Sequence, residues 1–345
     1  MDSFIALPEA ERRTYCEQAQ AKLGLPPSGI EKDFWVCWVL RELIRLPDWG
    51  PRFSFKGGTS LSKGWKLIDR FSEDLDIVID REFLGFGGEM SPEAATGAKG
   101  IKRRLKELKA TCQVRIHEDL KPRLDGRFRT ALPTGTAWSL MPDESDPDRQ
   151  TLLFGYPGVF TSSATYLRPV VKIEMGARSD TEPSEQPVIQ TYLAEAFPKL
   201  LKESSFVART VAQERTFWEK AMLLHEETYR PRDKHRNARL ARHYYDLWCL
   251  ITKGVGDRAL KAEGLFKRVA KHRALFFHQN WMDYATLRPE SLRLVPLEDQ
   301  LTEWRTDYNA MRGEMFFGEP PPFAEILRVV GEFQERVRHS GMWRP

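Results

Sequence analysis

Residues 56–80, KGGTSLSKGWKLIDRFSEDLDIVID, place a double glycine ahead of an apolar run that contains Asp74 and Asp76. Successive side chains of a strand point to opposite faces, so residues two apart share a face. If the run is a strand, its apolar side chains face the core and both aspartates face outward together. Two carboxylates held this close repel each other unless a cation lies between them. We therefore expect a strand with a cation-binding face, occupied by Mg²⁺ or Mn²⁺.

The double glycine predicts a close approach between the backbone and another group. Glycine has no Cβ, so Gly57 and Gly58 can adopt positive φ angles. A helix that starts near Ser60 points its free N–H groups at the same place, which suits a phosphate. The stretch is not a Walker loop, because Lys63 precedes Gly64 and GxxxxGK[ST] is absent.

Alone, GG is usually a turn and DxD is usually a solvated pair. Together, in the order strand, glycine turn, helix and DxD strand, they favour a phosphoryl or nucleotidyl transfer site, because Mg²⁺ takes oxygen ligands and bridges substrate phosphates. Ser72 is either a turn hydroxyl or a ligand of that site.

The bulk properties exclude several classes of protein. The chain has 345 residues and a net charge of +4, which permits a polyanionic partner without requiring one. No apolar stretch approaches the roughly 20 residues that span a bilayer, and the N-terminus does not resemble a secretory signal. The scattered histidines form no zinc motif. We expect a cytoplasmic protein with four buried, reduced cysteines, Cys16, Cys37, Cys112 and Cys249.

The apolar pattern changes along the chain. Helical spacing predicts helices over 8–23, 30–46, 61–69, 98–110, 212–228, 238–252, 258–270 and 322–339. Short apolar runs between Pro and Gly predict strands over 52–55, 75–79, 113–117, 151–156, 167–175, 188–192 and 206–210. The glycine-rich tract 85–97 reads as a loop. We predict an α+β fold, with a mixed-sheet lobe over 1–210 and a helical lobe over 211–345.

Several motifs together resemble the AbiEii/AbiGii-type nucleotidyltransferase toxins, a family that includes the MenT-like enzymes and belongs to the DNA polymerase β-like nucleotidyltransferase superfamily. The most specific matching motif is GGTSLSK followed by DRFSEDLDIVI. The resemblance as a whole spans residues 29–250. Further matches are GIEKDFWVCWVLREL (29–43), VVKIEMGARSD (170–180), EKAMLLHEE (219–227) and RHYYDL (242–247).

The resemblance implies a nucleotidyltransferase fold for the N-terminal lobe, with the helical lobe completing the active-site cleft. It implies a metal-dependent toxin that uses a nucleoside triphosphate and acts on RNA such as tRNA 3′ ends, in a toxin–antitoxin or phage-defence system. A cognate antitoxin with a winged-helix region is the implied protein partner.

The resemblance also assigns roles to individual residues. Ser72 and Asp74 match the family's serine and first catalytic aspartate, and Asp76 matches the second metal carboxylate. Lys220 matches the lysine of the EK motif, and Asp246 matches the last aspartate of RDxxD. The chain departs from RDxxD, because Arg242 is followed by His243 in place of the first aspartate.

Glu174, Lys220 and Asp246 can also be interpreted from the residues around them. In VVKIEM, Glu174 is either a third site carboxylate that binds metal or accepts a proton, or half of a surface Lys–Glu pair. Lys220 lies at the margin of an apolar stripe, where the residues alone favour an ammonium that reaches water, and the resemblance favours one that holds a β- or γ-phosphate. Asp246 lies at a similar margin and needs a cationic partner, Lys220 or an arginine.

The segment 229–242, YRPRDKHRNARLAR, is the strongest basic run between those two positions. A solvated charge run is the default interpretation, but its place between Lys220 and Asp246 favours phosphate or RNA binding. Its candidates are Arg230, Arg232, Lys234, Arg236, Arg239 and Arg242. The nucleotide-binding candidates are Gly57, Gly58, Thr59, Ser60, Lys63 and Lys220.

Two alternatives remain open. The acceptor is a protein or a small molecule instead of RNA, or the chain is a module that binds nucleotide or RNA without turnover. The sequence does not distinguish among the nucleotides.

Overall fold

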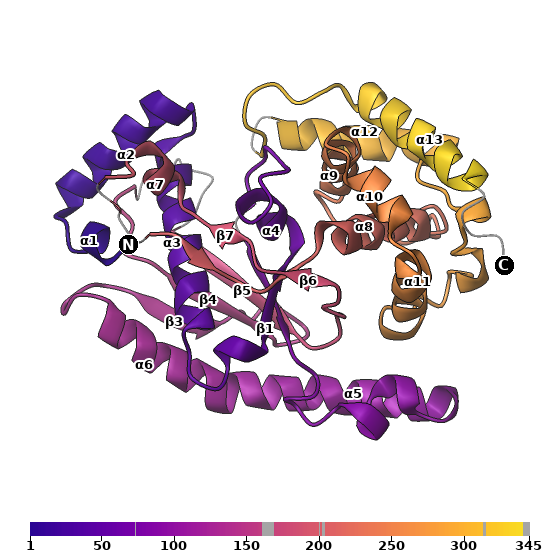
Figure 1. Ribbon diagram of the computed structural model, residues 1–345, viewed down its shortest axis with the longest axis horizontal. Helices are drawn as coiled ribbons and strands as arrows, with labels where there is room; N and C mark the ends of the chain where they lie inside the picture. The colour runs from indigo at the N-terminus through magenta and orange to yellow at the C-terminus, as the bar shows by residue number, and fades with distance from the viewer. Residues whose placement is uncertain (73, 161–168, 200, 202–203, 313–314, 341–345) are drawn as a thin grey trace. The chain divides into compact units, whose positions relative to one another are not determined.

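The computed structural model describes residues 1–345 except 73, 161–168, 200, 202–203, 313–314 and 341–345 (Figure 1). The chain divides into two compact units, each with its own core. The first contains Met1–Trp65 and Phe71–Val211, and the second contains Lys66–Arg70 and Ala212–Pro345. A short piece of chain early in the sequence therefore belongs to the helical unit.

A mixed sheet forms the centre of the first unit (Figure 1). Its strand order is β3-β4-β5-β2-β1-β9-β6, in which β2 runs antiparallel to β1 and parallel to β5. The strands are β1 (Phe53–Lys56), β2 (Asp74–Ile79), β3 (Ser139–Pro142), β4 (Thr151–Gly155), β5 (Val170–Gly176), β6 (Ser184–Glu185) and β9 (Thr210–Val211). A separate two-stranded ribbon pairs β7 (Val188–Ile189) with β8 (Phe206–Val207).

Helix α3 (Pro27–Ile44) packs against β2 and β5 and supplies the aromatic part of the core. Trp35 and Trp38 are fully buried, and Trp38 stacks on Phe154 of β4 at 5.5 Å between ring centroids. This interior fixes the inner face of β2, because Leu75 and Ile77 are buried there while the aspartates take the other face. The other helices of this unit are α1 (Asp2–Ile5), α2 (Glu9–Leu23), α4 (Gly57–Lys63), α5 (Gly97–Arg115), α6 (Lys121–Ala131) and α7 (Tyr192–Ala196).

The predicted strand over 113–117 is wrong, because the chain remains helical there. Helix α5 continues through a π-helical turn, Ile116–Leu120, into α6. Fully buried residues recur every four positions along this stretch, which is the spacing of one helical face: Leu108, Cys112, Ile116, Leu120, Leu124 and Phe128. The helical spacing of these buried residues can be recognised only over the longer stretch, because a five-residue window around 115 contains too few of them.

Other expectations needed smaller corrections. Helix α4 begins at the double glycine and ends at Lys63, and Lys66 adopts φ 52°, so the predicted helix over 61–69 is displaced. Beyond Ile189, the predicted strand over 188–192 gives way to α7, whose start is capped by the Thr191 side chain. The strand predicted over 206–210 is split into β8 and β9.

The remaining predicted elements of the first unit are largely confirmed. The strand predicted over 167–175 is β5, with 167–168 outside the described residues, and the basic helix predicted over 98–110 is the start of α5. The tract 85–97 contains two single-turn 3₁₀ helices, Gly88–Met90 and Pro92–Ala94. Strand β3 and helix α6 were not predicted.

The second unit is helical, as predicted. Its helices are α8 (Gln213–Glu227), α9 (Arg242–Thr252), α10 (Val255–Lys261), α11 (Leu265–Phe276), α12 (Leu301–Arg312) and α13 (Phe323–His339). Helix α13 packs on α9, and Phe217 and Trp218 of α8 form edge-to-face contacts with Phe333 and Phe266. The helix predicted over 258–270 is two helices separated at Gly264, where φ is 71°. Helix α12 was not predicted.

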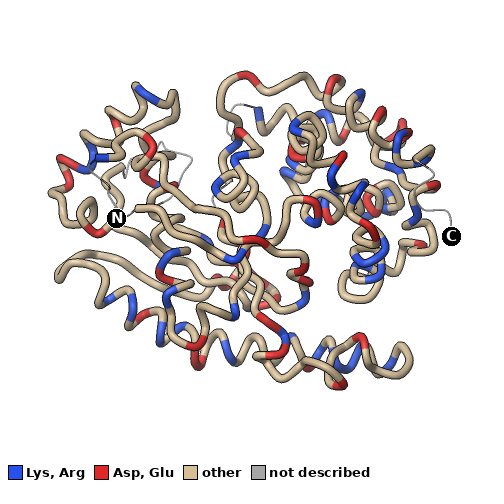
Figure 2. The backbone as a smooth tube through the Cα atoms, viewed as in Figure 1, with Lys and Arg blue, Asp and Glu red and all other residues tan. Residues whose placement is uncertain are grey.

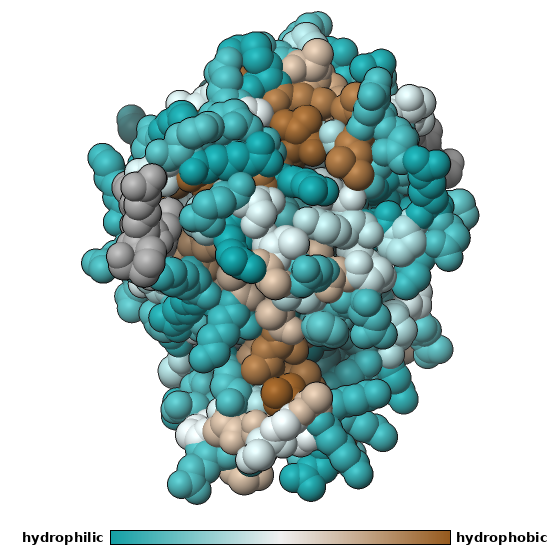
Figure 3. Space-filling model, turned by 90° about the vertical axis from the view of Figure 1, so that its right-hand side faces the viewer, coloured by the Kyte–Doolittle hydropathy of each residue, from teal (hydrophilic) through white to brown (hydrophobic). Residues whose placement is uncertain are grey.

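The surface and the thiols agree with the sequence. Within the described residues, no helix is long and apolar enough to cross a membrane. The face drawn in Figure 3 is mostly hydrophilic, with separate small apolar patches. Basic and acidic residues alternate along much of the chain (Figure 2). All four cysteines are buried and free, as predicted.

Candidate active site

Asp74 and Asp76 lie on one face of β2, and both are half-buried. In the register with β5, Asp74 lies opposite Lys172 and Asp76 lies opposite Glu174. In the register with β1, Asp76 lies opposite Lys56. Paired residues of neighbouring strands point to the same side. The sheet therefore gathers three acidic and two basic side chains on one face, which we call the acid face.

The glycine turn touches this face directly. Gly57 has φ 77°, and a Cβ added there would lie 1.8 Å from Oδ2 of Asp76 and 2.6 Å from its Cγ. Real atoms do not approach so closely, so only glycine leaves room for the Asp76 carboxylate. The double glycine and the second aspartate, 19 residues apart in sequence, are thus packed against each other.

A hydroxyl pair fixes the start of β2. Thr59 Oγ1 lies 2.6 Å from the carbonyl oxygen of Asp74 and 2.8 Å from Ser72 Oγ. A hydroxyl has one proton, so Thr59 donates to the carbonyl and accepts from Ser72. Thr59 is almost fully buried. These contacts give Thr59 and Ser72 the role of holding α4 beside β2, so that the position of Asp74 is set by the turn.

Glu174 makes an ion pair in this structure. Lys172 Nζ lies 2.7 Å from Glu174 Oε1 and 3.8 Å from Oδ2 of Asp143, which follows β3. Burial lowers the pKa of Lys172, but Glu174, Asp74 and Asp143 outweigh burial and raise it overall. With Lys56, four carboxylates and two ammonium groups surround the face, an excess of two negative charges. That excess attracts a divalent cation.

The acid face fits a magnesium-type ion with few protein ligands. Within the described residues, no group of three or more His, Cys, Asp or Glu side chains is arranged to hold a metal ion. Mg²⁺ commonly uses one or two carboxylates and completes its shell with water and substrate phosphates. Asp74 and Asp76, on one face of β2 and with Asp76 against the glycine turn, match that requirement.

The candidates on α4 have structural contacts. Ser60 is fully buried, and its hydroxyl donates to the Gly57 carbonyl at 2.9 Å. Lys63 is buried, with Nζ 2.5 Å from Asp33 Oδ1 and 3.6 Å from the centre of the Tyr192 ring. Burial lowers the pKa of Lys63, but Asp33 reverses this and raises it. The structure thus uses Lys63 to join α4 to α3, which differs from the predicted phosphate contact. Gly58 lies in the first turn of α4.

The second unit contains a buried charge cluster around Asp246, which is fully buried on α9. Arg70 holds it through two parallel hydrogen bonds, Nε to Oδ1 and Nη2 to Oδ2, both at 2.7 Å. Lys220 of α8 places Nζ 2.8 Å from Oδ2. The bidentate arginine is the strong partner, because its fork matches the carboxylate.

The pKa values of Lys220 and Asp246 are both lowered, but for different reasons. Burial raises the pKa of Asp246, but Arg70 and Lys220 outweigh burial and lower it, so the carboxylate stays ionised. The pKa of Lys220 is lowered by burial, and Arg70 and Arg242 act in the same direction against Asp246. Two cations thus keep Asp246 ionised, whereas burial is the main cause of the lowered pKa of Lys220. The cluster therefore has one surplus positive charge at Lys220.

His243 completes the cluster at the position where the family motif has an aspartate. Lys220 Nζ lies 3.3 Å from Nδ1 of His243. Burial, followed by Lys220 and Arg242, lowers the pKa of His243 well below its usual range. The ring is therefore neutral and accepts the lysine proton at Nδ1. An aspartate would cancel the surplus charge, whereas this histidine preserves it.

The basic segment between α8 and α9 is largely paired. Arg230 makes two hydrogen bonds of 2.6 Å with Glu227, and Arg236 lies 3.2 Å from the same carboxylate. Arg232 lies 2.5 Å from Asp299. The backbone N–H of Arg239 donates to Asp307. Arg242 and Lys234 make no ion pair within the described part of the chain. The predicted cationic track is therefore partly neutralised, by Glu227 of α8 and by Asp299 of the 3₁₀ turn Glu298–Gln300.

Sequence reasoning missed Arg70 and Asp143. It predicted a cationic partner for Asp246, but Arg70 is 176 residues away, and nothing local identifies it. Asp143 follows a strand that was not predicted.

A family model and several solved structures match this chain, among them the two structures below. A family model described as nucleotidyl transferase AbiEii toxin, type IV TA system, matches residues 38–329. The structure of JHP933 from Helicobacter pylori is 15% identical, covers 88% of this chain and 88% of that chain, and has a TM-score of 0.38. MenT4, a nucleotidyltransferase toxin from Mycobacterium tuberculosis, is 16% identical, covers 89% of this chain and 100% of that chain, and has a TM-score of 0.37. No curated protein matches.

Proposed function

We propose a specific reaction for this chain, which belongs to the AbiEii family of nucleotidyl transferase toxins of type IV toxin–antitoxin systems. The chain is a nucleotidyltransferase, and the proposal concerns its metal, substrate and acceptor. It transfers a nucleotide from a nucleoside triphosphate to a hydroxyl group of RNA, with the 3′ end of tRNA as the acceptor, and it depends on a divalent cation. The observation that supports this most strongly is the contact between the glycine turn and the second of two adjacent carboxylates.

Asp74 and Asp76 would hold Mg²⁺ or Mn²⁺. When bound, the cation would neutralise charge on the triphosphate and favour ionisation of the attacking hydroxyl. Gly57 supports this role, because its missing Cβ leaves room for the Asp76 carboxylate to lie against the glycine turn. Glu174 is the candidate for a third carboxylate or for a base once Lys172 releases it. Thr59 and Ser72 act by positioning β2.

Lys220 is proposed to bind the β- or γ-phosphate. Asp246 and Arg70 support this role by fixing the lysine, while the surplus charge of the cluster remains at its ammonium. Asp246 and His243 each accept one hydrogen bond from the Lys220 ammonium, which leaves its third proton available. Arg70 precedes Asp74 by only four residues in the sequence, which joins the two groups of residues by a short piece of chain.

The reaction is a substitution at phosphorus. The acceptor hydroxyl oxygen attacks the α-phosphorus and loses its proton, the bond to the bridging oxygen breaks in line, and pyrophosphate leaves. The product is an RNA longer by one nucleotide. The family implies a cognate antitoxin, and we propose that the protein acts in the cytoplasm, in growth control or phage defence.

Labelled nucleotides test the acceptor. The protein is incubated with Mg²⁺ and each α-labelled NTP, together with total tRNA or with a total protein extract, and the products are separated by gel electrophoresis. We expect label in tRNA with one preferred nucleotide, and no label with Asp76→Asn. Label confined to protein would overturn the RNA acceptor and favour protein nucleotidylation. Pyrophosphate release without label in either would favour a small-molecule acceptor.

A further inference from the structure

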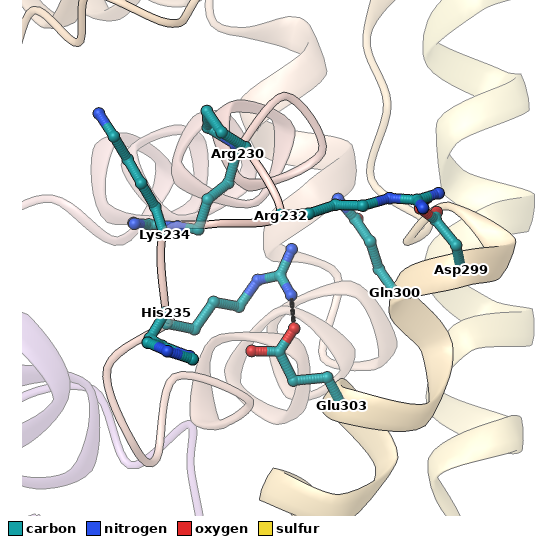
Figure 4. Close-up of a pocket in the computed structure, with 9 residues that line it drawn as sticks. Arg230, Arg232, Lys234, His235, Asp299, Gln300 and Glu303 are labelled. Carbon is teal, nitrogen blue, oxygen red and sulfur yellow. Dashed lines mark hydrogen bonds and ion pairs between the residues drawn. The ribbon is translucent and has the colours of Figure 1, made fainter.

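The loop between α8 and α9 lines a surface pocket of about 310 Å³ in the second unit (Figure 4). The loop contributes Arg230, Arg232, Lys234 and Arg236, and the 3₁₀ turn Glu298–Gln300 with α12 contributes Asp299 and Glu303. Four cationic side chains thus share the lining with two carboxylates. We call this site the loop pocket.

Each of the two carboxylates forms an ion pair with an arginine of the pocket. Arg232 Nη2 lies 2.5 Å from Asp299 Oδ2, and Arg236 forms an ion pair with Glu303, drawn as the dashed line in Figure 4. The Asp299 and Glu303 side chains are 42% and 53% exposed. The Arg232 side chain is 87% exposed, so water and salt screen its pair with Asp299, which is worth about 0–1 kcal/mol. Arg236 is only 8% exposed, and in its pair the Glu303 carboxylate is the partner that reaches solvent. Another anion can therefore displace these carboxylates.

Two further observations indicate an anion. Lys234 is exposed, extends away from both acids in Figure 4, and makes no ion pair within the described residues. Arg236 is positioned independently of Glu303, since Glu227 also holds its Nε at 3.2 Å and its guanidinium lies 4.8 Å from the centre of the Trp304 ring. The arginine would stay in place if Glu303 left.

We propose that the loop pocket binds a phosphate group of the RNA backbone, and that Asp299 and Glu303 are built-in competitors that hold this affinity down. The inference rests on the proposed RNA acceptor and adds a binding site to it. A guanidinium donates to carboxylate and phosphate through the same N–H groups, so one anion excludes the other. Each carboxylate also repels an incoming phosphate. Removing the acids therefore strengthens RNA binding, although they lie in a basic site.

The test measures binding of a fluorescent single-stranded 20-nucleotide RNA by anisotropy, in EDTA, without NTP and at fixed salt. The variant is Asp299→Asn with Glu303→Gln, and the matched control is Glu298→Gln with Glu319→Gln, which removes two exposed acids outside the pocket. We expect the Kd of the first to fall about tenfold and that of the control to change less than about threefold. Thermal unfolding verifies that each variant is folded.

The opposite change has its own control. Lys234→Gln should weaken RNA binding about threefold and reduce the salt dependence by about one phosphate contact, whereas Lys271→Gln on α11 should change neither. The loss should be smaller than the gain from the acid variant, because Lys234 leaves the arginines in place.

A second arm distinguishes two sources of phosphate, with inorganic tripolyphosphate as the competitor. RNA displaced by a similar RNA but not by tripolyphosphate supports the proposal. Tripolyphosphate binding that gains tenfold while RNA binding does not would overturn the RNA assignment in favour of a triphosphate site. If the Asp299→Asn, Glu303→Gln variant binds RNA no more tightly than the control variant, the competitor role of the two acids is overturned. If that variant still labels tRNA, the proposed function stands without the competitor role.

Discussion

Asp76 and Asp246 both have cationic neighbours, but their surroundings differ. Asp76 lies half-buried on an open sheet face beside Gly57, with more carboxylates than ammonium groups around it. Asp246 is fully buried, and Arg70 and Lys220 together outnumber its charge. One region has an excess of negative charge, and the other has an excess of positive charge at a lysine. The first suits metal binding, and the second suits phosphate binding.

The comparison also separates function from stability. A half-exposed carboxylate among like charges contributes little to folding, so its removal should affect chemistry alone. A buried carboxylate with two partners leaves two uncompensated charges when removed, so its removal should affect folding as well as chemistry. The following variants test this division.

The largest effect is expected on activity, from Asp76→Asn. Loss of a metal carboxylate should reduce nucleotide transfer at least about 100-fold, while the free energy of unfolding changes by less than about 0.5 kcal/mol. Initial rates with labelled NTP and urea denaturation measure the two quantities. A variant that loses several kcal/mol would place Asp76 in the structural group with Asp246.

Asp246→Ala should destabilise the protein by about 3–5 kcal/mol, because it strands Arg70 and Lys220 in a buried site. Urea denaturation measures this, with Asp257→Ala, an exposed acid on α10, as the control. A change under about 1 kcal/mol would mean that the cluster is solvated, contrary to its burial.

His225 gives the second unit a dependence on pH. Its Nδ1 accepts from the Arg293 N–H at 2.9 Å, and Nε2 lies 3.1 Å from Thr286 Oγ1. Burial, with nearby Arg293 and Arg338, lowers its pKa from 6.5 to about 4.

Above pH 6.5 the ring is neutral whether folded or unfolded. As pH falls from 6.5 to 4, only the unfolded chain takes up the proton, so about 3 kcal/mol of stability is lost, and no more below that. Denaturation at pH 7.5 and 4.5 measures the loss, and His225→Gln should reduce it by about that amount. An unchanged pH dependence in this variant would show that other groups cause it.

Among the site variants expected to lose stability, Gly57→Ala should lose the least, about 1–3 kcal/mol, from its positive φ and the contact with Asp76. Gly85→Ala is the matched control, since Gly85 has φ 86° with nothing within 4 Å of an added Cβ. Both should lose stability, but only Gly57→Ala should lose activity. Equal transfer activities of the Gly57→Ala and Gly85→Ala variants would mean that Gly57 is needed only for the conformation of the turn.

The sequence was sufficient for local geometry. Strand alternation placed Asp74 and Asp76 on one face, because Leu75 and Ile77 must be buried. It was insufficient where the partner is distant. Arg70 belongs with Asp246, and Lys63 with Asp33, through packing that no local pattern encodes. The helix at 113–117 was missed because a five-residue window is shorter than the period of its buried face.

The charge run 229–242 shows the same limit. Composition predicted free cations, but the structure pairs several of them with acids outside the run, on α8, on the 3₁₀ turn Glu298–Gln300 and on α12. The acidic side chains that lie near a basic run in the folded structure have to be included before a binding surface is inferred from that run.

Binding of Mn²⁺ in the presence of a non-hydrolysable NTP analogue tests the central claim most directly, with free Mn²⁺ measured by electron paramagnetic resonance. We predict saturable binding by the wild-type protein and by Lys271→Gln, and loss of that binding in a variant with Asp74→Asn and Asp76→Asn. Equal affinity and stoichiometry in the asparagine variant would mean that the ion is held elsewhere, and the proposed chemistry of the acid face would be contradicted.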